Sequence, residues 1–297
     1  PGKLSAMAIH FWKRFSESLG TRNFGDDLNP LLLEKLFSKR LIESREACIL
    51  GIGTILNDEN LAAMQSYEKK IVFSSGTGYG DFAGQLDASW QVACVRGPKT
   101  AGVMNIDPSK AVCDGAVLLS DFHDVVPEAK RDAVVFIPHV HTDRAIGRGL
   151  RDICGRLGLR YVTPAVPHED FIREVSAARL VVTEAMHGAI LADTMRTPWI
   201  CCHIMNHNRF KWEDWCASVG VPYAPAFLGV RFSDEGLSSP RQLPRYLVSG
   251  LRRRRIEARL RAVVRAGAPV LSDGEVLEAR KSRLRAIIRE INLEHGN

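Results

Sequence analysis

Short apolar runs rich in β-branched residues alternate along this 297-residue chain with segments of helical periodicity. Such alternation is typical of parallel sheets whose strands are joined by crossover helices, so it predicts an α/β fold. The predicted strands cover residues 8–12, 47–51, 70–75, 91–96, 133–138, 159–163, 179–183 and 198–202. The predicted helices cover residues 27–40, 97–103, 143–157, 168–178, 185–195 and 208–219, and two more follow in the last part of the chain.

The strand pattern restarts after a polar, charged stretch around Pro127. A chain of this length, with 45% hydrophobic residues, can form two domains that each have their own core. We therefore predict Rossmann-like domains at residues 1–125 and 126–235, followed by a basic helical tail at residues 236–297. Such sheets bind ligands at the carboxyl ends of their strands, which places the expected site in a cleft between the two domains.

Positive charge is concentrated in the last part of the chain. Residues 240–297 contain 14 Lys and Arg against 6 Asp and Glu, a net charge of +8, whereas the preceding residues contain 26 and 28 and carry −2. In residues 250–267, apolar residues recur at near-helical spacing among arginines, which predicts an arginine-rich helix. Such a helix suits either contact with an anionic membrane or packing against the protein with a solvated arginine face. It lacks aromatic residues for stacking bases, so we expect no nucleic-acid partner.

The seven cysteines are scattered and lie mostly within apolar segments, and none has the CxxC spacing of a zinc site. We predict buried thiols in a reducing cytoplasm and no bound metal. No apolar run reaches the roughly 18 to 20 residues of a membrane helix, and the first residues lack the apolar region of a secretory signal. A cytoplasmic protein is expected, with peripheral contact at the inner face of the cell membrane through residues 250–267.

Glycine-rich and polar segments follow the predicted strands, on the side of the sheet where ligands bind. Glycines there let backbone N–H groups approach a ligand, and helix amino ends favour anions. No glycine pair is completed to a dinucleotide fingerprint and no P-loop occurs, so each pair also suits a tight structural turn. From the segments RNFGDDLNP, GIGT and SGTGYG, the candidate substrate-binding residues are Asn23, Gly25, Asp26, Gly53, Thr54, Thr77 and Gly78.

Three cations are candidate anion ligands. Arg96 follows a predicted strand, where a guanidinium can hold a carboxylate or phosphate, or can cap the strand end at the surface. Arg209 and Lys211 lie in the segment HNRFKWEDW. In that segment Trp212 and Trp215 have the spacing of one helix face, and we expect them in the core.

Two histidines follow strands of the second predicted domain, His139 in the segment FIPHVH and His187 in TEAMHG. A side chain with a pKa near 6.5 can donate or accept a proton at neutral pH. At His187 a helix amino end would lower the pKa, whereas Glu184 would raise it, and the sequence leaves the balance open.

Several of these segments resemble, in the same order, those of the polysaccharide pyruvyl transferase family. The matching segments, between about residues 22 and 216, are NFGDDLNP, GIGT, GTGYG, VRGPKT, CDGAVLL, FIPHV, RLVVTEAMHGAILAD, TPWI and NRFKWEDW. The resemblance implies two Rossmann-type domains in a GT-B-like arrangement, with phosphoenolpyruvate (PEP) in the cleft and no metal or other cofactor. It also implies transfer of the pyruvyl group to a sugar, where it forms a cyclic ketal.

The resemblance also implies roles for single residues. Arg96 would bind an anionic group of PEP, and His187 would contact the phosphate or move a proton. His139, Asn23 and Asp26 are placed in the cleft. The candidate catalytic residues are therefore His187, Arg96 and His139, and further candidate substrate-binding residues near His187 are Glu184, Met186 and Gly188.

The chain departs from the family pattern at two places. Many members have an arginine and a leucine directly before the histidine, where this chain has Ala185 and Met186. We therefore expect Arg209 or Lys211 to replace the missing cation. Some members also carry a histidine where this chain has SGTGYG, so His139 is the expected substitute for the general acid.

The predicted protein is a bacterial transferase that forms a pyruvate ketal on a lipid-linked saccharide during exopolysaccharide biosynthesis. Two alternatives stay open. A GT-B-type glycosyltransferase would use a nucleotide sugar, although Glu184 is not followed by a second acidic residue eight positions later. A non-catalytic partner in polysaccharide assembly would use the arginine-rich helix as its docking surface.

Overall fold

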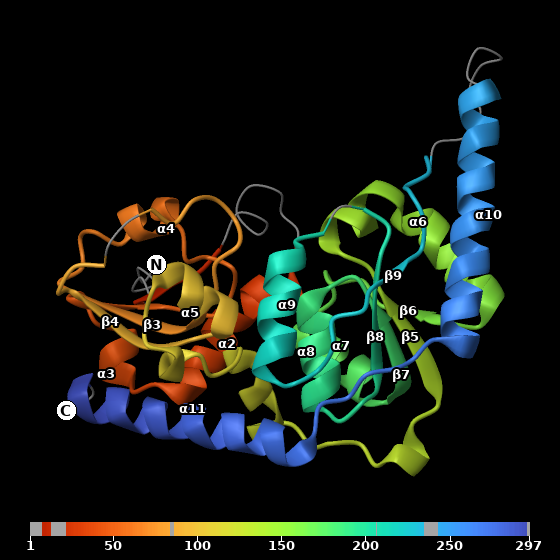
Figure 1. Ribbon diagram of the computed structural model, residues 1–297. Coiled ribbons are helices and arrows are strands. Elements are labelled where there is room, and N and C mark those ends of the chain that lie inside the picture. The colour runs from red at the N-terminus through yellow and green to blue at the C-terminus, as the bar shows by residue number, and fades with distance from the viewer. Residues whose placement is uncertain (1–7, 13–21, 84–85, 206, 235–242, 296–297) are drawn as a thin grey trace, which may run out of the picture.

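The computed structural model describes residues 8–12, 22–83, 86–205, 207–234 and 243–295. They form an α/β structure with two parallel sheets that come from successive halves of the chain (Figure 1). The α/β class predicted from the sequence is confirmed. The GT-B-like arrangement and the domain limits at residues 125 and 235 stay predictions.

The first sheet has the strand order β1-β2-β3-β4, and all three pairings are parallel. Its strands are β1 (Ile9–His10), β2 (Ala47–Leu50), β3 (Lys69–Ser75) and β4 (Trp90–Val95). The helices of this half are α2 (Phe24–Leu36), α3 (Lys39–Ile42), α4 (Asp58–Ala63) and α5 (Pro98–Met104).

The second sheet has the order β6-β5-β7-β8-β9 and is also parallel. Its strands are β5 (Ala133–Ile137), β6 (Arg160–Tyr161), β7 (Ala178–Thr183), β8 (Trp199–His203) and β9 (Ala226–Phe227). Its helices are α6 (Val140–Leu157), α7 (His168–Ser176), α8 (Met186–Thr194) and α9 (Arg209–Ser218). Three short 3₁₀ helices lie between β4 and β5, namely η1 (Pro108–Lys110), η2 (Gly115–Asp121) and η3 (Glu128–Lys130).

All eight predicted strands are present, although β1 and β6 have only two residues each. The sequence did not predict β9 or α4. The helix predicted at residues 27–40 is two helices, because Phe37 is extended and Ser38 starts α3 by accepting a hydrogen bond from the backbone N–H of Leu41. A side chain that caps a new helix ends the preceding one more firmly than periodicity alone can show.

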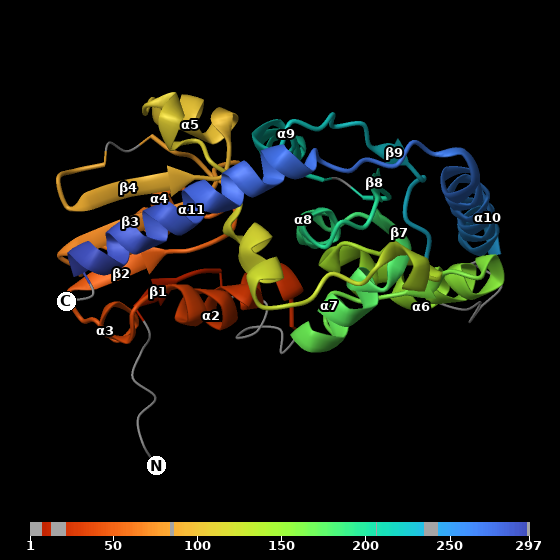
Figure 2. The ribbon, with the colours of Figure 1, turned by 90° about the horizontal axis from the view of Figure 1, so that it is seen from below.

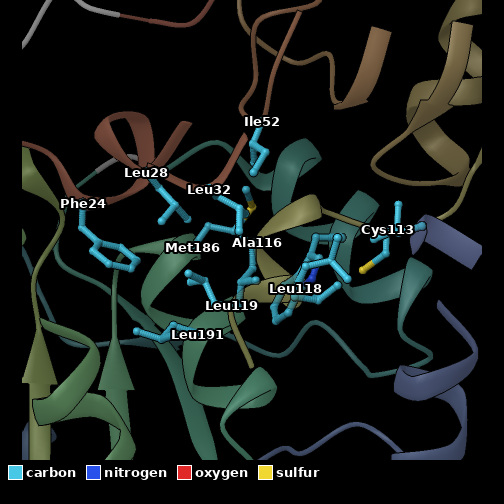
Figure 3. Packing of buried hydrophobic residues seen from close by; sticks show 14 of the residues in the cluster. Phe24, Leu28, Leu32, Ile52, Cys113, Ala116, Leu118, Leu119, Met186 and Leu191 are labelled. Carbon is cyan, nitrogen blue, oxygen red and sulfur yellow. The ribbon is translucent and has the colours of Figure 1, made fainter. Parts of the chain in front are cut away.

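The largest hydrophobic cluster is shared by the two halves. Leu28 and Leu32 of α2 lie beside Ala116 of η2 and Met186 of α8 (Figure 3). The sequence predicted a core for each half, and each half has a smaller cluster of its own beside this shared one. The largest cluster extends across both halves because every residue of α8 except His187 is buried, so this helix makes contacts on all sides.

The last two helices return to the body of the protein. Helix α10 (Leu243–Ala266) packs on the second half through Ile256 and Leu260, and its arginines face outward. Helix α11 (Gly274–His295) lies across a face of the first sheet, where Leu284 and Ile288 join the shared cluster (Figure 2). Packing against the protein, one of the two alternatives that the sequence left open for the arginine-rich helix, is therefore observed. Helix α11 packs on the first half.

Two further expectations can be compared with the structure. All seven cysteines are buried and free, as the sequence predicted. Within the described residues, no helix combines the length and apolar character needed to cross a bilayer.

Candidate functional site

A cleft of about 1120 Å³ lies between the two halves of the protein. Residues from both halves line it, as expected for the carboxyl ends of parallel strands. The predicted site residues that line the cleft are Asn23, Gly25, Asp26, Gly53, Thr54, His139, Glu184, Met186, His187, Gly188 and Lys211. Most of the predicted site therefore lies in one cavity.

Four helices of nine or more residues begin at the wall of this cleft, as does the six-residue helix α4. Helices α6, α8 and α9 follow the carboxyl ends of β5, β7 and β8, and α2 begins beside them. Their N-cap residues Asn23, His139, Ala185 and Asn208 all line the cavity. The amino end of a helix carries unpaired N–H groups and partial positive charge, so four of them together favour a ligand with several negative charges.

Lys211, in the first turn of α9, is the only Lys or Arg among the described residues that line the cleft. Its ammonium lies 5.3 Å from the centre of the Tyr79 ring. Arg209 does not line the cavity, because its side chain is 78% exposed and pairs with Glu213 on the outer surface. The sequence offered both cations as a replacement for the missing arginine, and the structure brings only Lys211 to the cleft.

Asp26 lies in the first turn of α2, where its carboxylate accepts a hydrogen bond of 2.5 Å from the side chain of Asn23. Burial raises the pKa of Asp26 to about 7, against the opposing effects of Asn23 and Lys211. A carboxyl group with this pKa is protonated in a large fraction of molecules at neutral pH. It is therefore able to donate a proton.

Both predicted histidines are neutral at pH 7. Burial, with a smaller contribution from the charge of Lys211, lowers the pKa of His139 to about 3. Burial also lowers the pKa of His187 to about 3, with Lys211 and Arg96 adding to the effect. In the unliganded cleft these rings are proton acceptors rather than imidazolium donors. The sequence left open whether the pKa of His187 is raised or lowered, and in the structure it is lowered.

Glu184 ties together the strand ends of the second sheet. One carboxylate oxygen accepts a hydrogen bond of 2.6 Å from the backbone N–H of Ile204, and the other accepts one of 3.2 Å from that of His139. Burial raises the pKa of Glu184 to about 7, while these backbone hydrogen bonds oppose the rise. The carboxylate thus fixes the start of α6 and the segment after β8.

Arg96 is fully buried beneath the cleft and does not line it. Its guanidinium donates to the carboxylate of Asp214 at 3.1 Å, to the hydroxyl of Thr54 at 2.8 Å and to the backbone carbonyl of Thr77 at 3.2 Å. Direct contact with an anion in the cleft does not fit this placement. Arg96 instead holds the two turns that carry Thr54 and Thr77.

Thr77 and Gly78 also lie outside the cleft lining. Thr77 is buried, and its backbone N–H donates to the hydroxyl of Thr100 at 3.2 Å. The carbonyl of Gly78 accepts a hydrogen bond from the side chain of Asn208 at the start of α9. The predicted substrate-binding turn therefore supports α9, and its last two residues, Tyr79 and Gly80, reach the cavity.

Residues 22–203 match the polysaccharide pyruvyl transferase family over more than half of the chain. The chain belongs to this family. It is also 37% identical over 205 residues to the succinoglycan biosynthesis protein ExoV of Rhizobium meliloti (strain 1021). That match covers 68% of this chain and 63% of the relative, so it spans less than two thirds of the relative's length. The family resemblance drawn from the sequence motifs is confirmed.

The family match ends before α9, so Lys211 lies outside the part of the chain that identifies the family. Trp12, Asn57 and Glu59 also line the cleft and were not predicted from the sequence. Trp12 stands at the end of a predicted strand, and this position could have identified it as a candidate site residue. Asn57 and Glu59 belong to α4 and its cap, which the sequence did not reveal.

Another missed residue is Asp114, which stands in the recognised segment CDGAVLL and lies behind His187. Among the described residues, no group of three or more His, Cys, Asp or Glu is arranged to hold a metal ion. The described side chains of the cleft include one ammonium group, two carboxyl groups with a raised pKa, those of Asp26 and Glu184, and neutral imidazoles.

Removing the carboxylate of Asp214 should strongly destabilise the fold. Asp214→Ala leaves the fully buried charge of Arg96 without its partner, which costs about 3–5 kcal/mol of unfolding free energy. Glu213→Ala is the matched control, because the neighbouring carboxylate forms only partly exposed pairs with Lys99 and Arg209 and should cost less than about 1 kcal/mol. Urea unfolding of both variants measures the difference, and equal losses would contradict the importance of the buried pair.

Proposed function

We propose that this protein transfers a pyruvyl group from PEP to a sugar of an exopolysaccharide repeat unit and forms a cyclic pyruvate ketal. Membership of the pyruvyl transferase family supports a transferase acting in polysaccharide biosynthesis. The observation that carries the choice of donor is the convergence of four helix amino ends and Lys211 on one cleft. PEP carries a carboxylate and a phosphate close together, and such a cleft suits two adjacent anionic groups.

Asp26 is the proposed general acid. The reaction begins when the carboxyl proton moves to C3 of PEP, which creates positive character at C2. Asp26 is suited to this step because its pKa of about 7 leaves it partly protonated at neutral pH. The sequence predicted His139 for this role, but the low pKa of His139 favours the neutral ring.

Two sugar hydroxyls then react at C2, and phosphate is released. One sugar hydroxyl forms a bond to C2 and gives its proton to a base of the cleft. A second hydroxyl then attacks C2, the bond between C2 and the phosphate oxygen breaks, and inorganic phosphate leaves with the proton that the base had taken. The proton of the second hydroxyl restores the carboxyl group of Asp26. No metal or other cofactor takes part in this scheme.

The size and lining of the cleft also fit a sugar acceptor. PEP in contact with the helix amino ends leaves room in a cavity of about 1120 Å³. The wall formed by the first half carries Trp12, Tyr79 and Glu59. Aromatic faces and carboxylates suit the apolar faces and hydroxyl groups of a saccharide.

Lys211→Ala should weaken PEP binding, because it removes the one Lys or Arg side chain that the described part of the chain contributes to the cleft wall. A charge-assisted hydrogen bond contributes about 1.5–3 kcal/mol, so we expect affinity to fall about 10- to 100-fold. Isothermal titration calorimetry with PEP measures this without an acceptor. Arg209→Ala is the matched control from the same helix turn and should change affinity less than about threefold.

Two outcomes of that titration would overturn the assignment. Equal affinity of wild type and Lys211→Ala for PEP would show that Lys211 is not an anion ligand. Binding of a nucleotide sugar such as UDP-glucose, with no binding of PEP by the wild type, would favour a glycosyltransferase.

The rate of phosphate release from PEP should fall as the pH rises through about 7, because Asp26 must be protonated to act and its pKa lies there. Asp26→Asn should lower the rate about 10²- to 10⁴-fold at every pH, as expected for loss of a general acid. Asp27→Asn is the control, since the Asp27 carboxylate accepts from the backbone N–H of Asn23 and does not line the cleft. Phosphate release is measured with saccharide fragments of succinoglycan as acceptors, and a wild-type rate that rises through pH 7 would contradict this role.

We also propose that α10 brings the protein to an anionic membrane surface, where a lipid-linked acceptor at the cytoplasmic face would be found. The amino end of α10 projects beyond the second sheet (Figure 1), and Leu247, Val248 and Leu251 are exposed there beside arginines. Exposed leucines next to cations are suited to the interface of an anionic bilayer.

Replacing Leu247 and Leu251 together by Ser should reduce sedimentation of the protein with phosphatidylglycerol vesicles several-fold, because it removes the apolar contact. Both side chains are more than half exposed, so the fold should be unaffected. Neutral phosphatidylcholine vesicles are the control. Equal sedimentation of wild type and variant with the anionic vesicles would refute membrane contact through these leucines.

A further inference from the structure

Asp114 lies directly behind His187, at the start of η2. The side chain of Asp114 is fully buried, and one of its carboxylate oxygens, Oδ1, accepts a hydrogen bond of 3.0 Å from the backbone N–H of Ala116. The other oxygen, Oδ2, lies 3.7 Å from Nε2 of His187. The pair thus joins the shared core to the cleft wall.

Neither of these two facing atoms has a hydrogen-bond partner among the described residues. Both Oδ2 of Asp114 and Nε2 of His187 are buried and unpaired. A buried polar atom without a partner destabilises the fold, and here a potential donor and an acceptor face each other at 3.7 Å. Hydrogen bonds at active sites are often long before the ligand binds and tighten afterwards.

Gly25 holds the opposite side of the imidazole ring. A Cβ atom at residue 25 would overlap Nδ1 of His187, so only glycine allows the ring its present place. Gly25 also lines the cleft. The ring is therefore held between Asp114 on its Nε2 side and the cleft wall on its Nδ1 side.

We propose that Asp114 is a positioning residue that selects the tautomer of His187. The Nε2–H group of His187 donates to Oδ2 of Asp114, which leaves the lone pair of Nδ1 directed toward the cleft. Within the proposed reaction, on which this inference rests, Nδ1 accepts the proton of the sugar hydroxyl that attacks C2. The proton later leaves with the phosphate, and the carboxylate of Asp114 stabilises the imidazolium in between.

The charges around the pair support this arrangement. Burial raises the pKa of Asp114 to about 6, and Arg96 opposes the rise while Asp214 adds to it. Asp114 is therefore mainly ionised at neutral pH. Burial, Lys211 and Arg96 lower the pKa of His187, so a neutral ring faces an ionised carboxylate. A bound anion such as PEP would offset the charge of Lys211 and raise the basicity of the ring.

Asp114→Asn tests the inference without changing the size of the side chain. Its Oδ1 can still accept from Ala116, which turns the amide NH₂ group toward Nε2 of His187 and forces the opposite tautomer. Nitrogen-15 NMR of the full-length protein labelled at histidine reports the tautomer, with His187 signals assigned by their loss in His187→Gln. We expect wild-type His187 to carry its proton on Nε2 and the Asp114→Asn variant to carry it on Nδ1.

The same variant should lower kcat for pyruvyl transfer about 10²- to 10⁴-fold, with KM for PEP changed less than threefold, because a wrong tautomer removes the base and not the anion site. Asp107→Asn is the matched control: Asp107 caps η1 as Asp114 caps η2, and its described hydrogen bond is to the backbone N–H of Ser109 and not to a histidine. It should change neither the tautomer nor kcat.

An unchanged tautomer in Asp114→Asn would overturn the inference, as would a change in KM with kcat preserved. The NMR result needs no turnover, so it separates this inference from the proposed function. Wild-type protein that shows the Nε2–H tautomer but never releases phosphate from PEP would refute the function and leave the pairing of Asp114 with His187 intact.

Discussion

The buried ion pair between Arg96 and Asp214 is the interaction on which the cleft depends. It joins the end of β4 in the first half to α9 in the second half over 3.1 Å, with both side chains excluded from solvent. Taking two charges out of water is costly, and the cost is offset only when every donor and acceptor is satisfied. The hydroxyl and backbone N–H of Thr100 complete the shell of Asp214, at 2.6 and 2.9 Å. Lys211 stands one turn before Asp214 on the same helix, so the pair also determines where the cleft cation lies.

The electrostatic environment of the cleft gives its carboxyl and imidazole groups different protonation states at neutral pH. Four helix amino ends and Lys211 are positive, and burial acts on every ionisable side chain nearby. For His139 and His187 both effects favour the neutral ring, whereas for Asp26 burial outweighs the attraction to Lys211. The result is a protonatable carboxyl opposite neutral imidazoles. A reaction in which the protein must both donate and accept a proton requires a separate acid and base.

Much of this arrangement could be predicted from the sequence, since local patterns determine the strands and parallel strands end on one side. That rule correctly brought Asn23, Asp26 and His187 to one cavity. It failed for Arg96, because a residue after a strand can turn either toward the ligand or beneath the sheet, and the deciding partner, Asp214, lies 118 positions away. The pairing of Asp114 with His187 and the return of α11 to the first sheet are equally long-range, and no local periodicity encodes them.

The resemblance drawn from the sequence implied an arginine where this chain has Ala185, and the structure shows what placing the cation elsewhere involves. An arginine at that place would stand at the N-cap of α8, which is fixed by the shared core. Lys211 instead reaches the cleft from α9, whose position is set by the Arg96–Asp214 pair and by the hydrogen bond from Asn208 to the carbonyl of Gly78. In both contacts the partner of α9 is a residue of the first half, Arg96 or Gly78. The cation of the cleft is thus held in place by contacts between the two halves of the chain.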